Sequence, residues 1–128
     1  MNINFLGGKK VSATYNGFTI ESDQPRMAGG EESAPSPSAL LIASVGTCAG
    51  FYVQFFCQKH GISMDEVKMT VLAEPDNRTG LFGKIIIDLK LKQKFPEKYI
   101  KAIKSAANAC VVKKTIANSP EFIIRTGQ

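Results

Sequence analysis

The sequence predicts an α+β fold in a single domain that covers residues 1–128. Two segments alternate apolar and polar residues around turn sequences, which is the pattern of β-hairpins. A long uncharged segment between them repeats its apolar residues at helical spacing. The length of 128 residues, with 44% hydrophobic and 21% charged residues, is that of an average globular domain. The expected order is a β-hairpin or small sheet, a long helix, a second hairpin, a helix, a short helix and a final strand.

The first hairpin joins residues 11–15 to residues 18–22, both of which alternate. Asn16-Gly17 lies between them and supplies the two positive-φ residues of a type I′ turn. Ile3 and Phe5 indicate a further strand before this hairpin.

A loop over residues 23–36 separates this hairpin from the long helix, because prolines and Gly29-Gly30 interrupt any regular pattern there. Ser36 is a suitable N-cap, and Pro37 loses no needed N–H at the first helical position. We expect the helix to run to about Lys59, with Gly61 as the left-handed residue after its end.

The apolar residues of this helix follow one another at spacings of four, three, four and three, so they share one face. These residues are Leu41, Val45, Cys48, Tyr52 and Phe55. The pattern predicts that this face is buried and that Cys48 lies in it. The small residues Gly46, Ala49 and Gly50 beside Cys48 allow another element to approach closely.

Residues 40–57 contain no charge, which meets the length of roughly 18 residues that marks a transmembrane candidate. However, Ser44, Thr47 and Gln54 interrupt the apolar run. We therefore expect a core helix rather than a membrane span.

The second hairpin pairs residues 67–74 with residues 84–91 around a turn at residues 76–80. Pro96-Glu97 opens a helix, because proline suits the first helical position and an acid suits the first turn. Its apolar stripe is expected at Ile100, Ile103 and Ala107. Residues 110–117 form a short further helix, and residues 122–124 form a last strand.

The formal charge of +5 rests largely on lysines in the second half of the chain. They are Lys84, Lys90, Lys92, Lys94, Lys98, Lys101 and Lys104. Such a cluster is compatible with nucleic-acid binding. A solvated face is the favoured interpretation, because no aromatic residues interleave and no nucleic-acid motif is present. The sequence therefore predicts no nucleic-acid partner and no membrane partner.

Residues 1–6 lack the basic and apolar regions of a secretory signal, so we expect a cytoplasmic protein with reduced thiols. The three cysteines and one histidine match no zinc-site spacing, and the sequence predicts no metal and no cofactor. His60 is expected to complement the dipole at the end of the long helix.

The cysteines carry the candidate chemistry. Cys57 is interpreted as a buried apolar residue, because it directly follows Phe55 and Phe56 near the end of the helix. Local physics favours Cys110 as the more acidic of the other two, because it opens a short helix whose N-terminal dipole stabilises a thiolate. Cys48 lies in mid-helix, so a cation from elsewhere in the fold would have to activate it.

Two segments are similar to the OsmC/Ohr superfamily, which comprises osmotically inducible protein C-like and organic hydroperoxide resistance proteins. They are Ala34-Pro-Ser-Pro-Ser-Ala-Leu-Leu-Ile-Ala-Ser-Val-Gly-Thr-Cys48-Ala and Ala109-Cys110-Val-Val. The resemblance covers nearly the whole chain and is greatest to small OsmC-like proteins whose helix starts with Ala-Pro-Ser-Pro. It implies an intertwined homodimer with active sites at the dimer interface.

The resemblance also implies a thiol-dependent peroxidase that reduces organic hydroperoxides in oxidative stress defence. In that interpretation Cys48 is the peroxidatic thiolate and becomes a sulfenic acid. Cys110 is the resolving thiol, and an external dithiol reduces the resulting disulfide. The resemblance thus implies that Cys48 is the reactive thiolate, whereas the local helix dipole favoured Cys110 as the more acidic thiol.

The family's arginine corresponds to Arg26 in the loop before the helix, with Lys9 as the alternative cation. Arg26 is favoured because its permanent charge and several donors suit a thiolate and a peroxide oxygen. The family's glutamate after the helix-opening proline is Ser38 here, and Glu31 or Glu32 would have to replace it. Val111 stands where the second family motif has proline.

These departures leave a second interpretation open, a non-catalytic protein that binds a small apolar ligand at the dimer interface. Leu41, Val45, Tyr52 and Phe55 would then line the site. A bound ligand without peroxide turnover would distinguish it from the peroxidase.

Overall fold

The computed structural model describes residues 1–127, which form two compact units. The first unit comprises Met1–Ala43, and the second begins at Ser44. The predicted α+β class is confirmed, whereas the single domain over residues 1–128 stays a prediction.

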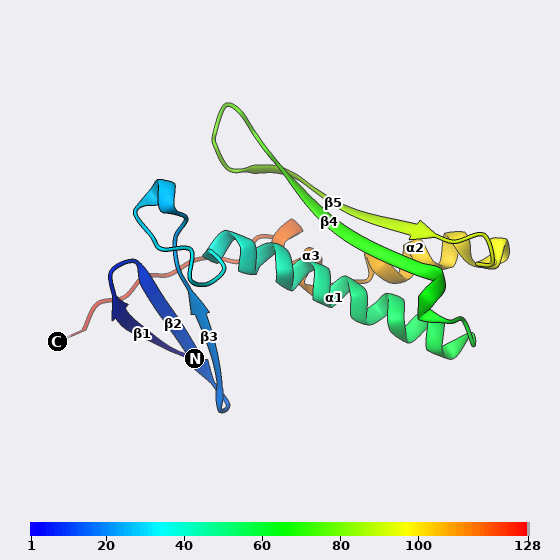
Figure 1. Ribbon diagram of the computed structural model, residues 1–128, viewed down its shortest axis with the longest axis horizontal. Coiled ribbons are helices and arrows are strands. Elements are labelled where there is room, and N and C mark those ends of the chain that lie inside the picture. The colour runs from blue at the N-terminus through cyan, green and yellow to red at the C-terminus, as the bar shows by residue number, and fades with distance from the viewer. Residues whose placement is uncertain (128) are drawn as a thin grey trace. The chain divides into compact units, whose positions relative to one another are not determined.

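The first unit contains a three-stranded antiparallel sheet in the order β1-β2-β3 (Figure 1). Its strands are β1 (Asn2–Gly7), β2 (Lys10–Tyr15) and β3 (Phe18–Ser22). Asn16 has φ 47° and Gly17 has φ 80°, so both central residues of the turn have the positive φ that a type I′ turn requires. The predicted hairpin and the strand before it are confirmed.

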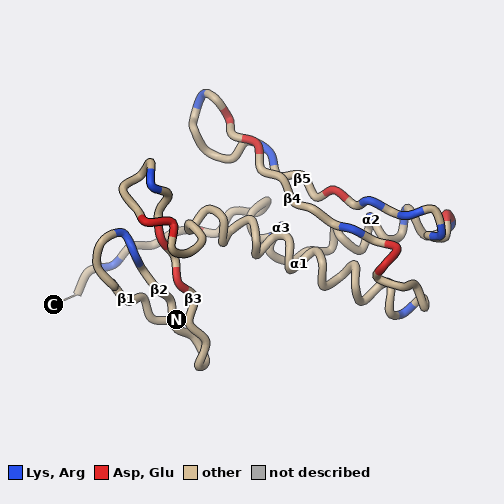
Figure 2. The backbone as a smooth tube through the Cα atoms, viewed as in Figure 1, with Lys and Arg blue, Asp and Glu red and all other residues tan. Residues whose placement is uncertain are grey.

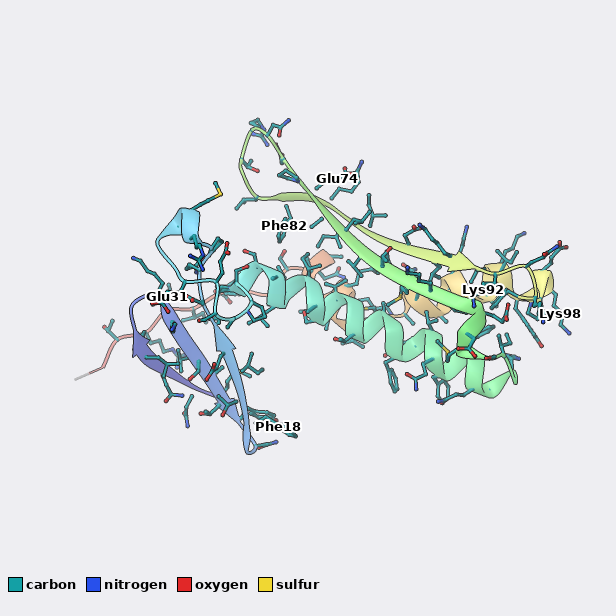
Figure 3. The ribbon with its side chains drawn as sticks, in the orientation of Figure 1. Phe18, Glu31, Glu74, Phe82, Lys92 and Lys98 are labelled. Carbon is teal, nitrogen blue, oxygen red and sulfur yellow. The ribbon has the colours of Figure 1, made fainter. Side chains whose placement is uncertain are left out.

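Many apolar side chains of this sheet are exposed in the single chain. They are Ile3, Phe5, Leu6, Tyr15, Phe18 and Ile20. Figure 3 labels Phe18 at the β2–β3 turn, where its side chain is 73% exposed. The sheet therefore presents more apolar surface than isolated surface residues would account for.

A loop with the short 3₁₀ helix η1 (Arg26–Ala28) leads from β3 to the long helix α1 (Pro37–Lys59). The Ser36 hydroxyl accepts a hydrogen bond from the Ala39 N–H at 3.2 Å, as expected of an N-cap. Gly61 has φ 65°, and the Ile62 N–H donates to the Cys57 carbonyl at 2.9 Å. Both predicted ends of the helix are confirmed.

In the second unit, the antiparallel hairpin of β4 (Val67–Pro75) and β5 (Phe82–Leu91) runs along α1 (Figure 1). The short helix η2 (Met64–Glu66) joins α1 to β4. A Cβ on Gly46 would lie 3.1 Å from Val71 Cγ2, and one on Gly50 would lie 3.2 Å from Met69 Cε. The two glycines thus give β4 the close approach to α1 that the sequence predicted.

After β5, the 3₁₀ helix η3 (Glu97–Tyr99) precedes α2 (Ile100–Asn108), and α3 (Val111–Ala117) follows. The core of this unit lies between α1 and α2. Its buried residues are Val53, Cys57, Phe95, Ile103 and Ala107. Cys57 is therefore the buried apolar residue that the sequence predicted.

The predicted buried face of α1 is wrong in part. The buried residues are Val45, Ala49, Val53 and Cys57, at a spacing of four. Leu41 and Phe55 are 42% and 57% exposed, and Cys48 is half-buried. The hairpin packs closely against Gly46 and Gly50, so the buried face of α1 is not the one that carries Leu41 and Phe55.

The predicted last strand is also wrong for the single chain. Residues 118–127 follow α3 without regular secondary structure, and Phe122 and Ile124 are 87% and 94% exposed. A strand forms only when a neighbouring strand accepts its backbone hydrogen bonds. No such pairing occurs for this segment within the described residues.

By length and composition α1 could cross a membrane, although core helices of soluble proteins pass the same test. Its charges are confined to its end, whereas lysines gather on β5 and α2 (Figure 2). All seven lysines of the sequence cluster are exposed, as the solvated face requires.

Candidate functional site

Cys48 and Cys110 meet in the second unit, although 62 positions separate them in the chain. Cys48 lies in the middle of α1, and Cys110 is the N-cap residue of α3. The Cys110 sulfur lies 3.7 Å from the carbonyl oxygen of Val45, three residues before Cys48, and neither cysteine is in a disulfide. The fold therefore brings together the two cysteines that the sequence analysis singled out.

Cys110 is held tightly at this position. Its side chain is fully buried, and its sulfur lies 3.7 Å from the Val45 carbonyl oxygen, to which the thiol can donate. The Lys113 N–H donates to the same sulfur at 3.3 Å. Val45 lies three positions before Cys48, which is slightly less than one helical turn. These contacts therefore fix Cys110 against the part of α1 that carries Cys48.

The electrostatic surroundings of the two thiols differ. Hydrogen bonds from the Val112 N–H, the Cys110 side chain and the Val111 N–H lower the pKa of Cys48 below its ordinary value, against the opposing effect of burial. Burial raises the pKa of Cys110, and the neighbouring Cys48 raises it further. Cys48 is therefore the more acidic thiol of the pair.

The prediction from the helix dipole that Cys110 is the more acidic thiol is wrong. Cys110 does lie at a helix N-terminus, but its sulfur is removed from water, which penalises the charged form. The backbone N–H groups of Val111 and Val112 lower the pKa of Cys48 instead. These backbone donors were missed in the sequence, because only the tertiary contact between α3 and α1 shows which sulfur they face.

Arg26 lies in the first unit, in the loop between β3 and α1. Its Nε is 3.7 Å from Glu32 Oε2, and its backbone N–H donates to Glu32 Oε1 at 3.4 Å. The Arg26 side chain is 79% exposed. Glu32 has φ 55°, an uncommon conformation for a residue with a side chain.

The other residues considered with Arg26 have different partners. Glu31 forms an ion pair with Lys10 at 2.7 Å (Figure 3 labels Glu31). Ser38 is exposed in the first turn of α1, and Lys9 lies beside Gly29. Of the two glutamates proposed to replace the family's glutamate, Glu32 is the one that contacts Arg26.

Asp23 anchors this loop and was not singled out in the sequence. Its carboxylate is 1% exposed and accepts hydrogen bonds from the Ser33 hydroxyl at 2.7 Å and from the backbone N–H groups of Gln24, Glu31 and Ser33. These donors lower the pKa of Asp23 to about 2. The loop that carries Arg26 is thus closed around a buried carboxylate.

An apolar pocket of about 280 Å³ is lined by residues of β5 and α3 and by Val45 of α1. Phe82, Ile85, Ile87 and Ile116 contribute apolar lining, and Lys84 and Lys113 supply charge. Of the residues expected to line a ligand site, Val45 alone is among the lining residues. In residues 1–127, no group of three or more His, Cys, Asp or Glu side chains gathers as a metal site would.

Comparison with known proteins assigns the chain to a family. Residues 29–125 match the family model described as OsmC-like protein. The match covers most of the chain and includes both Cys48 and Cys110. Arg26 lies just before the matched residues. The chain therefore belongs to the OsmC-like protein family, and the resemblance seen in the sequence is confirmed.

Solved structures share this fold at low sequence identity. An OsmC-like protein from Mycoplasma pneumoniae has a TM-score of 0.68 at 19% identity over 91% of this chain and 86% of its own. The organic hydroperoxide resistance protein OhrB of Bacillus subtilis has a TM-score of 0.54 at 21% identity over 91% and 90%. A Vibrio cholerae structure described as an organic hydroperoxide resistance protein, with captopril in one active site, has a TM-score of 0.62 at 16% identity over 91% and 83%. No curated protein matches the sequence.

Proposed function

We propose that this protein is a thiol-dependent peroxidase that reduces organic hydroperoxides. The observation that carries the proposal is the packing of Cys110 against α1 three residues from Cys48, with the pKa of Cys48 lowered and that of Cys110 raised. A peroxidatic thiol must ionise to attack, and a resolving thiol must lie within reach of the oxidised sulfur. Membership of a family with organic hydroperoxide resistance proteins among its structural neighbours supports the assignment.

The first step is attack of the Cys48 thiolate on the terminal oxygen of the hydroperoxide. An S–O bond forms as the O–O bond breaks, and the leaving alkoxide takes a proton and departs as the alcohol. Cys48 is oxidised to the sulfenic acid, and the peroxide is reduced by two electrons. Because Cys48 is half-buried, its sulfur stays accessible to a substrate from solution.

Resolution follows at the same place. The Cys110 sulfur attacks the Cys48 sulfenic acid, a disulfide forms, and the sulfenic oxygen leaves as water after taking the Cys110 proton. An external dithiol then exchanges with this disulfide, so that both cysteines return to thiols and the dithiol is oxidised. Since Cys110 packs against α1 three residues from Cys48, resolution would require only local movement.

Arg26 is our choice for the cation that binds the peroxide and the Cys48 thiolate, with Lys9 as the alternative. Its guanidinium carries a permanent charge and several donors, which suit the two oxygens of a peroxide. Glu32 contacts Arg26 and would orient the guanidinium.

A homodimer is part of the proposal. A second copy would cover the apolar side chains exposed on β1, β2 and β3 of the first unit. It would also cover Phe51 and Phe55, which are exposed on α1 in the second unit. The exposed segment 122–124 would gain a strand partner in such an assembly. We also propose that the protein works in the cytoplasm, where thiols stay reduced.

Stopped-flow consumption of cumene hydroperoxide with a dithiol reductant tests the proposal. Cys48→Ser should abolish turnover, whereas Cys57→Ala, which alters a core cysteine away from the site, should keep it. Turnover that survives in Cys48→Ser would refute the peroxidase.

A second candidate function rests on the apolar pocket between β5 and α3. Its aliphatic lining with lysines beside it suits a small apolar ligand that carries a negative group. Native mass spectrometry of the purified protein would show such a ligand. A bound ligand in a protein without peroxide turnover would favour this function over the peroxidase.

A further inference from the structure

A side-chain hydrogen bond bridges the turn between α2 and α3. The Lys113 ammonium group donates through Nζ to the side-chain carbonyl oxygen Oδ1 of Asn108. Asn108 is the last residue of α2, and Lys113 lies in the first turn of α3. Cys110 lies between them in the chain, as the N-cap residue of α3. The bridge therefore spans the residue to which the proposed function gives the resolving role.

Lys113 also contacts Cys110 directly. Its backbone N–H donates to the Cys110 sulfur at 3.3 Å, and the Lys114 N–H donates to the Cys110 carbonyl oxygen at 3.1 Å. On its other side the Cys110 sulfur lies 3.7 Å from the Val45 carbonyl oxygen of α1. The backbone of Lys113 thus holds the sulfur of Cys110, while the side chain of Lys113 holds the end of α2.

The α2 end of the bridge is firmly anchored. Ile103 is fully buried and Ala107 is nearly so, and both belong to the core of the second unit. The Cys110 N–H donates to the Ala107 carbonyl oxygen at 3.4 Å, so the chain turns out of α2 directly into Cys110. A hydrogen bond to the last residue of α2 therefore ties the start of α3 to a fixed element.

The α3 end of the bridge is loosely packed. Two cavities, of about 280 and 410 Å³, share Lys113 and Ile87 of β5 as lining residues. A side chain that borders empty space loses the contacts that would otherwise fix its conformation. Asn108 lines the larger of the two cavities. The hydrogen bond to Asn108 is therefore the contact that fixes the Lys113 side chain.

We propose that Asn108 and Lys113 are positioning residues for the resolving thiol of Cys110. Their hydrogen bond keeps the start of α3 against the part of α1 that carries Cys48. The inference rests on the proposed function, because it takes Cys110 as the thiol that resolves Cys48. A disulfide forms only within a narrow range of Cα separation and sulfur orientation. Loss of the bridge therefore slows the attack by Cys110 and leaves the first reaction of Cys48 unchanged.

One equivalent of dithiodipyridine measures the two reactions separately and without peroxide. The Cys48 thiolate attacks the S–S bond of the reagent, a mixed disulfide forms and one thiopyridone leaves. Cys110 then attacks the Cys48 sulfur, and the second thiopyridone leaves with the Cys110 proton. Stopped-flow absorbance follows both releases. A Cys57→Ala background ensures that only these two cysteines react.

Asn108→Ala and Lys113→Met should each slow the second release about threefold or more, the effect of losing one hydrogen bond, with the first release unchanged. Asn108→Asp and Lys113→Arg keep the acceptor and the donor, so they should retain the wild-type rate. Lys104→Met is the matched control, because it removes another lysine from the lining of the larger cavity without touching the bridge. It should follow the wild type.

The double variant Asn108→Ala/Lys113→Met distinguishes the bridge from a general loosening of the fold. If both residues act through one hydrogen bond, the double variant should be no slower than the slower single variant. Slowing that adds up in the double variant, or a second release in Lys113→Met as fast as in Lys104→Met, would overturn the proposal. Asn108 is exposed, so its replacement leaves the core intact.

Peroxide turnover of the wild type, measured in parallel, separates this inference from the proposed function. A slowed second release in both bridge variants, with no peroxide turnover in the wild type, would support the positioning role and refute the peroxidase. Peroxide turnover in the wild type, with the same second release in every variant, would do the reverse.

Discussion

The Cys110 thiol lies 3.7 Å from the backbone carbonyl oxygen of Val45, a residue in the buried face of α1. Cys48 is three positions further along the same helix, so a contact to Val45 brings Cys110 to Cys48 as well. The carbonyl of Val45 can accept a hydrogen bond from the thiol, which favours the neutral form of Cys110. The two cysteines therefore differ in acidity in the reduced protein.

The first prediction concerns the order in which the cysteines react. Cys48 should be alkylated first as the pH rises, because its pKa is lowered while burial raises the pKa values of Cys57 and Cys110. Iodoacetamide labelling at a series of pH values, read by peptide mass spectrometry, checks this order. Labelling of Cys110 ahead of Cys48 would contradict the assignment of the thiolate.

The second prediction concerns Cys110→Ser. The first oxidation of Cys48 should proceed, because the nucleophile and the amides that face it remain. Resolution should fail, so a Cys48 sulfenic acid should accumulate and react with dimedone. Intact mass with and without dimedone measures this, with Cys57→Ala as the control that still forms a disulfide. A Cys110→Ser protein that sustains wild-type turnover would show that another thiol resolves Cys48.

The third prediction decides between the two candidate cations. Arg26→Ala should slow the oxidation of Cys48 by cumene hydroperoxide about tenfold or more, as expected for the loss of charged hydrogen bonds. Lys9→Ala should stay within about twofold of the wild type, because a solvated lysine contributes little. Single-turnover kinetics measure both rates. The opposite pattern would transfer the role to Lys9.

How far the sequence predicted the structure depends on the kind of signal. Asn16-Gly17, Ser36 and Gly61 have local preferences strong enough to mark a turn and both ends of α1, and all three were confirmed. The buried face of α1 was predicted from the spacing of its large apolar residues. That prediction failed because the hairpin packs against the small residues, a choice that depends on tertiary contact.

The candidate site was also predicted only in part from the sequence. Cys48 and Cys110 could be singled out as a pair by resemblance, but their contact and their relative acidity depend on burial and on where the amides of α3 point. Asp23 gave no signal, because its role comes from donors up to ten positions away that a loop folds around it. Local patterns do not encode such long-range hydrogen bonding.

The fourth prediction concerns Asp23 and acid. Asp23→Asn should lower the melting temperature at neutral pH, because an amide cannot accept from all the donors that surround the carboxylate. The folded-state pKa of about 2 lies below the ordinary value of 3.8, so the carboxylate stabilises the fold fully above pH 3.8. That contribution is lost as the pH falls through about 2.

Thermal unfolding of the wild type and Asp23→Asn across this pH range tests the prediction, with Asp65→Asn as an exposed control. The difference in melting temperature should be greatest at neutral pH and should shrink in acid. A difference that is independent of pH would show that the carboxylate charge is not what the loop needs.

The fifth prediction concerns the approach of β4 to α1. Gly46→Leu should destabilise the protein by about 1–3 kcal/mol, because the added side chain must displace Val71. Gln54→Leu, on the exposed side of the same helix, should change stability by less than about 0.5 kcal/mol. Chemical denaturation measures both, and equal stability of the two variants would contradict the packing.

The central claim is that Cys48 and Cys110 are a redox pair that a hydroperoxide oxidises. Intact-mass analysis of the reduced protein after one equivalent of cumene hydroperoxide tests it most directly, with Cys48→Ser and Cys110→Ser in parallel. The account predicts rapid loss of two hydrogens from the wild type, mapped to a Cys48–Cys110 disulfide, and no disulfide in either variant. A wild-type mass that stays unchanged over minutes would contradict it.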